Sequence, residues 1–167
     1  MKTLKEPGGL LLASIESADR IYSSFTDDYL SMKKTISVII TDDHHIFRNA
    51  AKTILESHPQ IKVVAVCESG EEAVELSKKL QPDIVLMDIN MEKLDGFEAT
   101  ALLRKELPGI KVVGFSVHNE PLYVSKMLQA GAMGYLTKTS PRSEIIEAIL
   151  KVHSGQQYIC KEIKENS

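Results

Sequence analysis

Residues 82–88 read Pro-Asp-Ile-Val-Leu-Met-Asp, and this short segment decides the fold. Its apolar run, Ile84–Met87, is continuous, begins with two β-branched residues and leads into a polar loop, which predicts a strand buried on both faces of a parallel sheet. Asp88 follows that strand directly. Because ligands of open α/β sheets bind beyond the carboxyl ends of the strands, Asp88 is a candidate site residue. Asp95 is expected to cap the next helix, and Gly96 to allow a close backbone turn there.

Apolar runs of similar length recur on both sides of this segment, and helical patterns separate them. The predicted strands cover residues 36–40, 63–67, 84–87, 112–115 and 134–137. A strand that alternates regularly with a helix predicts parallel strands joined by right-handed crossovers. The expected fold class is therefore α/β, a doubly wound five-stranded parallel sheet in the order 2-1-3-4-5, flavodoxin-like, with helices on both faces.

Length and composition set further bounds. The chain has 167 residues, which suggests one domain with an appendage, and its 43% hydrophobic and 26% charged residues are ordinary for a globular protein. A net charge of -3 argues against a general nucleic-acid-binding surface. Cys67 and Cys160 make no disulfide framework, and no apolar run approaches the roughly 18 residues of a membrane span. We therefore expect a cytoplasmic protein without a membrane segment.

The first residues differ from the rest, and we expect an N-terminal extension over 1–34, the main domain over 35–155 and a C-terminal linker over 156–167. An amphipathic helical stripe in the extension consists of Leu11, Ile15, Ala18, Tyr22, Phe25 and Tyr29. Such a helix would dock on the domain or pair with a second copy. The alternative is a loosely ordered leader, with Met32 as a natural translation start. The sequence leaves these alternatives open.

The predicted sheet order gathers polar residues from four strand ends at one edge: Asp42, Asp43, Asp88, Ser116 and Lys138. Carboxylates about 4 Å apart repel by roughly 4 kcal/mol per ionised pair at an effective dielectric constant near 20. Protonation or a bound cation relieves such repulsion, and oxygen ligands on an open rim suit Mg²⁺. A lysine and a hydroxyl facing the same point suit a tetrahedral anion. The sequence therefore predicts Mg²⁺ beside a phosphoryl group.

Several motifs together resemble the receiver domain of two-component response regulators over about residues 36–159. They are Asp42-Asp43-His44, Asp88 with Met91 and Asp95-Gly96, Ser116, and Gly134-Tyr135-Leu136-Thr137-Lys138. Phe47-Arg48, and Ser154-Gly155 leading to Tyr158-Ile159, are similar to the NarL/LuxR-type transcription regulators in particular.

The resemblance implies a role for each matching residue. The phosphoryl acceptor would be Asp88, with Lys138 and Ser116 binding phosphoryl oxygens. The Mg²⁺ ligands would be Asp43 directly, Asp42 through water, Asp88, and the backbone carbonyl of Asn90. Tyr135 would turn inward when Ser116 moves, and these two residues would form the switch.

The resemblance also implies the partners. A sensor histidine kinase would donate the phosphoryl group, and the domain would catalyse only its own phosphorylation and slow hydrolysis, without being a turnover enzyme. Phosphorylation would promote a homodimer through the face of the fourth helix, fifth strand and fifth helix. DNA would be bound only through a helix-turn-helix domain missing from this chain, and no membrane would take part.

Three positions depart from the family pattern: Glu92 and His45 stand where proline is frequent, and Val117 is bulkier than the usual residue. Glu92 is expected to loosen the loop after Asp88, and Val117 to narrow access to it.

Other classes of protein share parts of this pattern. An aspartate-nucleophile phosphatase would show Asp-x-Asp after the first strand, and a flavodoxin-like nucleotide binder would need a Gly/Ser-rich loop there. His44 and His45 beside two aspartates could indicate a transition-metal site, but the sequence lacks the further ligands that a tetrahedral site needs. A receiver that no longer switches and serves as a dimerisation module stays the alternative function.

Overall fold

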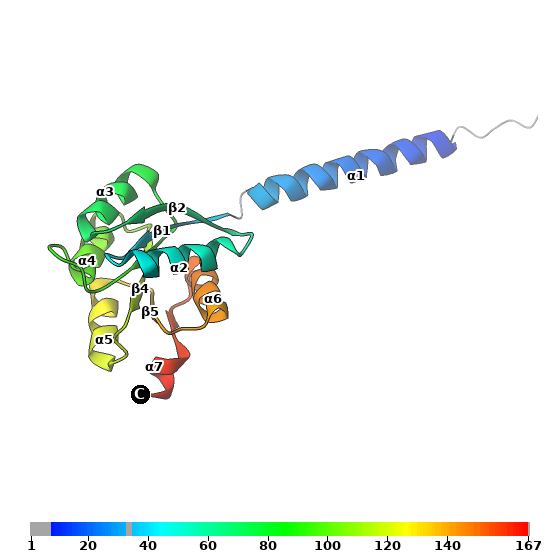
Figure 1. Cartoon of the computed structure of the whole chain (residues 1–167). Helices are drawn as coiled ribbons and strands as arrows, with labels where there is room; N and C mark the ends of the chain where they lie inside the picture. The colour runs from blue at the N-terminus through cyan, green and yellow to red at the C-terminus, as the bar shows by residue number, and fades with distance from the viewer. Residues whose placement is uncertain (1–7, 33–34, 167) are drawn as a thin grey trace, which may run out of the picture. The chain divides into compact units, whose positions relative to one another are not determined.

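The computed structural model describes residues 8–32 and 35–166, and it divides into two compact units, Met1–Thr35 and Ile36–Ser167 (Figure 1). The first unit contains helix α1, Gly8–Met32. Ile15, Tyr22 and Phe25 of the predicted stripe are exposed in it, whereas the side chains of Leu11 and Tyr29 lie outside the described residues. What this helix contacts stays a prediction.

The second unit alternates strands and helices, as the sequence pattern indicates. Its strands are β1 Ile36–Thr41, β2 Ile61–Cys67, β3 Ile84–Met87, β4 Lys111–Ser116, β5 Gly134–Thr137 and β6 Tyr158–Ile159. Its helices are α2 His45–Glu56, α3 Gly70–Leu80, α4 Gly96–Glu106, α5 Pro121–Ala130, α6 Arg142–His153 and α7 Lys161–Glu165.

The strands form one parallel sheet in the order β2-β1-β3-β4-β5-β6. This confirms the α/β class and the predicted order of the first five strands. Helices cover both faces: α2 packs against α6 on one face, and α3, α4 and α5 pack side by side on the other (Figure 1). The switch in strand order falls between β1 and β3, where a ligand site of a doubly wound sheet is expected.

The sixth strand is a difference from the predicted five. It lies in residues 156–167, which were expected to be a linker but contain β6 and α7. The Tyr158 amide donates to the Met133 carbonyl and the Cys160 amide to the Tyr135 carbonyl, both at 3.0 Å, so β6 covers the outer edge of β5. Cys160 and Ile163 are buried beside it. The remaining domain boundaries stay a prediction.

Local sequence signals set the ends of three helices. Ser69 accepts from the Glu72 amide at the start of α3, and Asp95 forms a capping box with Glu98 at the start of α4. Gly131 ends α5 with a φ of 117°, a left-handed conformation that glycine adopts without strain. The predicted caps at Ser69, Asp95 and Gly131 are confirmed.

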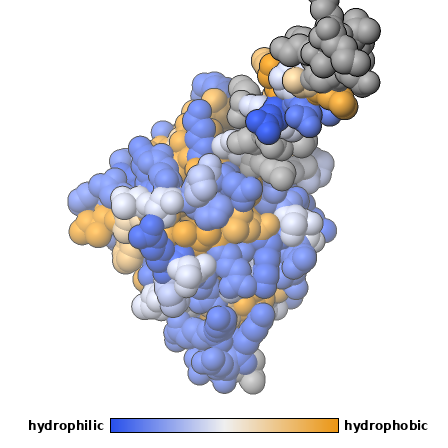
Figure 2. Space-filling view, turned by 90° about the vertical axis from the view of Figure 1, so that its right-hand side faces the viewer, coloured by the Kyte–Doolittle hydropathy of each residue, from blue (hydrophilic) through white to orange (hydrophobic). Residues whose placement is uncertain are grey.

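The core lies on both faces of the sheet. All four residues of β3 are fully buried, as expected for a central strand of a parallel sheet. Figure 2 shows one face of the protein, where hydrophilic residues surround a band of hydrophobic ones. The large hydrophobic side chains that stay exposed in the second unit are Ile46, Val66, Leu80, Val117 and Leu122. Among the described residues, none of the helices combines the length and the apolar character that crossing a membrane requires.

Candidate functional site

Parallel pairing brings the predicted site residues to one edge of the sheet. Thr41 pairs with Met87, so the residues that follow, Asp42 and Asp88, leave adjacent strands at the same level. The Asp88 amide donates to the Thr41 carbonyl at 2.8 Å. On the other side, the Lys138 amide donates to the Ser116 carbonyl at 2.7 Å. Four strand ends therefore meet where the sequence places its polar residues.

Lys138 forms the centre of this edge. Its ammonium nitrogen lies 2.7 Å from Asp42 Oδ2 and 3.2 Å from Asp88 Oδ1. All three side chains are at most 5% exposed. The Phe47 ring lies against the same ammonium, with its centroid 4.3 Å away. Because buried charges need close partners, this ion-pair group holds Lys138 in one place, pointing at Asp88.

The electrostatics of Asp88 follow from that neighbourhood. Burial and the nearby Asp42 carboxylate raise its pKa to about 6, against the opposing effects of Lys138 and of the Ile89 amide. That amide donates to Asp88 Oδ1 at 2.8 Å. A carboxyl with this pKa is mostly ionised at neutral pH, yet its charge is only partly compensated.

Asp43 and His44 complete a cluster with Asp42 and Asp88. Each of these side chains offers a ligand atom, and those atoms lie within 4.8 Å of one another. Asp43 is more exposed than Asp42, at 35% against 1%, and so faces the open side of the cluster. Three carboxylates with an excess of negative charge fit a hard cation such as Mg²⁺. A single imidazole, which lies 2.7 Å from Asp43 Oδ1, does not supply the nitrogen and sulfur set of a zinc site.

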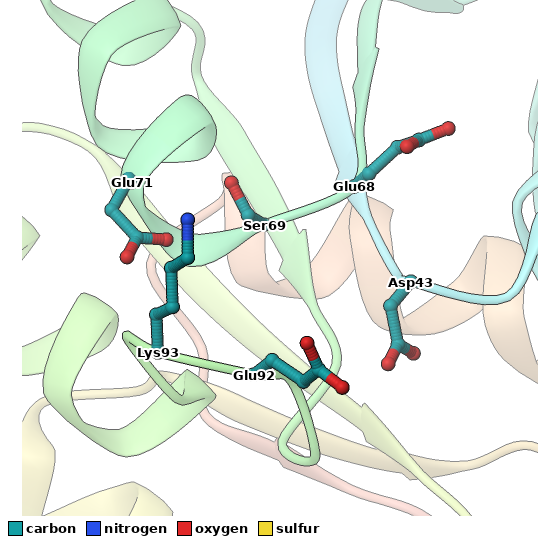
Figure 3. Close-up of a pocket in the computed structure, with 6 residues that line it drawn as sticks. All are labelled: Asp43, Glu68, Ser69, Glu71, Glu92 and Lys93. Carbon is teal, nitrogen blue, oxygen red and sulfur yellow. The ribbon is translucent and has the colours of Figure 1, made fainter.

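An acidic groove of about 490 Å³ opens beside Asp43 (Figure 3). Asp43, Glu68, Ser69, Glu71, Glu92 and Lys93 line it. Figure 3 shows the carboxylates of Asp43 and Glu92 turned toward the same space from opposite walls. Lys93, with a φ of 64°, holds the left-handed turn of the loop after Glu92. Glu92, the departure from the usual proline, therefore adds charge to the approach of the site.

Backbone packing fixes the loop that follows Asp88. The Gly96 amide donates to the Ile89 carbonyl at 2.9 Å. A Cβ on Gly96 would overlap the Asp88 carbonyl oxygen, so only glycine fits this close approach. The start of α4 is thereby held against the end of β3.

The structure places Ser116, Asn90 and Tyr135 around one residue that the sequence reasoning missed, His118. The His118 amide donates to Ser116 Oγ at 3.2 Å, and the Tyr135 hydroxyl donates to the His118 carbonyl at 2.8 Å. The Asn90 side chain lies 2.7 Å from His118 Nε2, while the His118 ring stacks on Tyr123 with centroids 3.8 Å apart. Ser116 thus bonds to this loop rather than to Asp88. A lone histidine in a polar loop has no periodic pattern that could have revealed it.

Tyr135, the predicted switch residue, is fully buried on β5. Its burial raises the pKa of the phenol to about 12. The ring therefore already occupies the interior in this structure, with its hydroxyl tied to the loop that follows Ser116.

The family model of the response regulator receiver domain matches residues 38–150. The chain is 44% identical to the transcriptional regulatory protein DegU of Brevibacillus brevis over 131 residues, which are 78% of this chain and 56% of DegU. The chain spans between 56% and 61% of the length of the curated relatives reported for it.

Solved structures agree in fold. A LuxR-family two-component response regulator from Aurantimonas sp. SI85-9A1 superposes with a TM-score of 0.76 at 31% identity, over 78% of this chain and 94% of that one. The signal receiver domain of the putative response regulator NarL from Mycobacterium tuberculosis gives a TM-score of 0.71 at 35% identity, over 74% and 99%.

Proposed function

This chain belongs to the response regulator receiver domains of the NarL/LuxR type, and from that premise we propose that Asp88 accepts a phosphoryl group from a sensor histidine kinase. The observation that carries the proposal is the ion-pair group at the sheet edge. Lys138 bridges Asp42 and Asp88 at 2.7 and 3.2 Å, so a cation already stands beside the proposed nucleophile.

Phosphoryl transfer requires mainly that the protein position the reacting groups and stabilise their charge. An Asp88 carboxylate oxygen forms a bond to phosphorus while the phosphorus–nitrogen bond of the donor's phosphohistidine breaks, and the imidazole leaves with the electron pair. Negative charge on the phosphoryl oxygens is spread over the transition state, where positioned cations stabilise it. Lys138 supplies one such charge, and Ser116 would donate a hydrogen bond once its loop turns toward the site.

Asp42, Asp43, Asp88 and the carbonyl of Asn90 would hold Mg²⁺. When bound, the ion neutralises the carboxylate cluster and the charge on the phosphoryl oxygens. The excess of carboxylates over ammonium groups in the described cluster supports this assignment. Asp43, the most exposed of the three carboxylates, is the one we assign to direct contact, and Asp42, already paired with Lys138, to contact through water.

A receiver domain is not a classical enzyme. We propose that this one catalyses its own phosphorylation and slow dephosphorylation at Asp88, and that Ser116 and Tyr135 form its switch. Phosphorylation is proposed to promote a homodimer.

The relatives are longer and include a transcriptional regulatory protein, which supports a DNA-binding domain beyond the matched region as the output. The free, buried thiols of Cys67 and Cys160 fit a reducing cytoplasm.

The test is direct chemical capture of the acyl phosphate. The full chain is incubated with acetyl phosphate and Mg²⁺, reduced with borohydride, which converts a phosphoaspartate to homoserine, and mapped by peptide mass spectrometry. Homoserine at position 88 is the expected result. Homoserine elsewhere, or none although the protein is folded and Mg²⁺ is present, contradicts the proposal.

The alternative, a receiver that serves only as a dimerisation module, is favoured by no observation on the site. Asp42, Asp43, Asp88 and Lys138 lie together, as phosphoryl acceptance requires.

A further inference from the structure

The C-terminal segment reaches the proposed phosphoryl site through one carboxylate, Glu162 on α7. Its Oε2 accepts from the Thr137 hydroxyl at 2.8 Å and from the Thr139 hydroxyl at 2.9 Å. Its Oε1 accepts from the Asn119 amide at 3.0 Å. These three donors hold the pKa of Glu162 below its usual range, the bond from Asn119 having the largest effect.

The three donors stand beside the two residues proposed to bind phosphoryl oxygens. Thr137 and Thr139 flank Lys138 on either side, and Asn119 lies in the loop that begins after Ser116. One carboxylate therefore ties together the loop after β4 and the loop after β5. Bonds to an ionised acceptor are roughly twice as strong as neutral ones, so this link restricts both loops.

The segment that carries Glu162 is itself built into the fold. Cys160 and Ile163 are buried, at 0% and 4% exposed. The Lys161 amide donates to Glu144 Oε1 at 2.7 Å, and the same oxygen accepts from the Tyr158 hydroxyl at 3.0 Å. The Cys160 amide donates to the carbonyl of Tyr135, the proposed switch residue. Glu162 is thus presented from a packed base and not from a loose tail.

We propose that Glu162 is a positioning residue for Lys138 and the point where the C-terminal segment is coupled to the phosphoryl site. The proposal rests on the function proposed above. Glu162 holds Thr137 and Thr139, and with them the backbone that carries Lys138, in the arrangement that binds a phosphoryl group. Because coupling between two sites is reciprocal, a ligand that orders the Lys138 loop stabilises α7 by the same factor. This coupling links the phosphoryl site to β6 and α7, the C-terminal elements of the described residues.

The experiment uses the full chain with Mg²⁺ and beryllofluoride, a stable mimic of the phosphoryl group. Glu162→Gln keeps the size of the side chain and removes the charge that three donors share. Glu165→Gln, an equal change of charge at an exposed position of the same helix, is the matched control. Beryllofluoride affinity is measured by fluorine NMR, and amide hydrogen exchange of residues 158–165 by mass spectrometry with and without the mimic. Circular dichroism and thermal unfolding establish that each variant is folded.

We expect Glu162→Gln to weaken beryllofluoride binding about five-fold or more, and Glu165→Gln to leave it unchanged. In the wild type and in Glu165→Gln, the mimic should slow amide exchange of residues 158–165, and Glu162→Gln should abolish that effect. A change in exchange that follows ligand binding is not produced by a residue that serves stability alone.

If Glu162→Gln does not fold, Asn119→Ala, which removes one of the three donors, should give a smaller shift in the same direction. Equal affinity and equal protection in folded Glu162→Gln and Glu165→Gln overturn the inference while the proposed function stands. Failure of the wild type to bind the mimic overturns both.

Discussion

Two aspartates flank β3, and their carboxylates have different neighbours. Asp83 precedes the strand, and its carboxylate accepts from the amide and the hydroxyl of Ser37 at 2.8 and 2.9 Å. The Asp83 amide donates back to the same hydroxyl at 3.0 Å. Asp88 follows the strand, is only 3% exposed, and meets Asp42 as well as Lys138.

The difference shows how the same residue type can serve different purposes at the two ends of one strand. At the amino end of the sheet, donors satisfy the carboxylate, and the pair joins β1 to the start of β3. At the carboxyl end, burial and the neighbouring Asp42 carboxylate together raise the pKa of Asp88 to about 6, and the carboxylates outnumber the ammonium that they share. A satisfied carboxylate stabilises the fold, whereas one whose charge is incompletely compensated fits the proposed binding of a cation and a phosphoryl group.

The largest contrast is expected in phosphorylation. Asp88→Asn should abolish labelling by acetyl phosphate and Mg²⁺, because the amide is not a nucleophile. Asp83→Asn, the same substitution at the other end of β3, should leave labelling intact. Phosphate-affinity gel electrophoresis of both variants measures this. Labelling that survives in Asp88→Asn would end the assignment of the acceptor.

Two glycines, one at the start of α4 and one in the turn between α4 and β4, give the next largest contrast. Gly96, beside Asp88, has no room for a Cβ, while Gly109, near the other end of the sheet, has nothing within 4 Å of that position. Gly96→Ala should cost about 3–4 kcal/mol of the free energy of unfolding, because backbone must move. Gly109→Ala should stay within about 0.5 kcal/mol. Urea unfolding followed by circular dichroism compares them, and equal stability would show that the Asp88 loop is not packed as described.

The carboxyl end of β3, with the residues that gather there, could be predicted from the sequence. The apolar run Ile84–Met87 marked the strand, and the residues at its carboxyl end marked the edge where Asp42, Asp43, Asp88 and Lys138 meet. Short-range patterns suffice here because burial on both faces demands a continuous apolar run, and parallel strands place their ends at one edge.

The C-terminal elements and the contacts of Glu162 and His118 could not be predicted from the sequence, for a physical reason. Tyr158–Ile159 is too short to show a strand pattern and becomes β6 only by pairing with the edge of β5. The bonds from Thr137 to Glu162 and from Asn90 to His118 join residues 25 and 28 positions apart through side chains. Contacts of this kind depend on tertiary packing, which neither propensity nor spacing records.

The stabilisation by Mg²⁺ should also differ between variants at the two ends of β3, by a smaller free energy. Bound only to the folded state, it stabilises by about 2.7 kcal/mol at 100 times its dissociation constant. The gain should shrink in Asp43→Asn more than in Asp42→Asn, because Asp42 already pairs with Lys138. Asp83→Asn should keep the whole gain. Thermal unfolding with Mg²⁺ and with EDTA measures it, and equal gains in all three variants would place the ion elsewhere.

The smallest contrast is expected in metal-free protein, where substitutions of Asp88 and Asp83 should change the free energy of unfolding in opposite directions. The folded-state pKa of Asp88, about 6, lies above the ordinary pKa of an aspartate, 3.8, so folding favours the protonated carboxyl. The stability that this group contributes is fully present below about pH 3.8 and is lost as the pH rises through about 6. Asp88→Asn, which cannot ionise, should therefore be more stable than the wild type at pH 7.5, by about 1–2 kcal/mol, and the gain should fade toward pH 4.

Asp83→Asn should act in the opposite direction, since it weakens the bonds from Ser37 and should cost about 1 kcal/mol at pH 7.5. Urea unfolding in EDTA at pH 4.5, 6 and 7.5 tests both variants on one scale. If Asp88→Asn destabilised the protein at every pH, the ion pair with Lys138 would outweigh the burial of the Asp88 carboxylate and its repulsion from Asp42, and Asp88 would be a structural element as Asp83 is. Opposite signs that diverge with pH would instead identify Asp88 as a carboxylate kept at a cost to stability, as expected of the proposed phosphoryl acceptor.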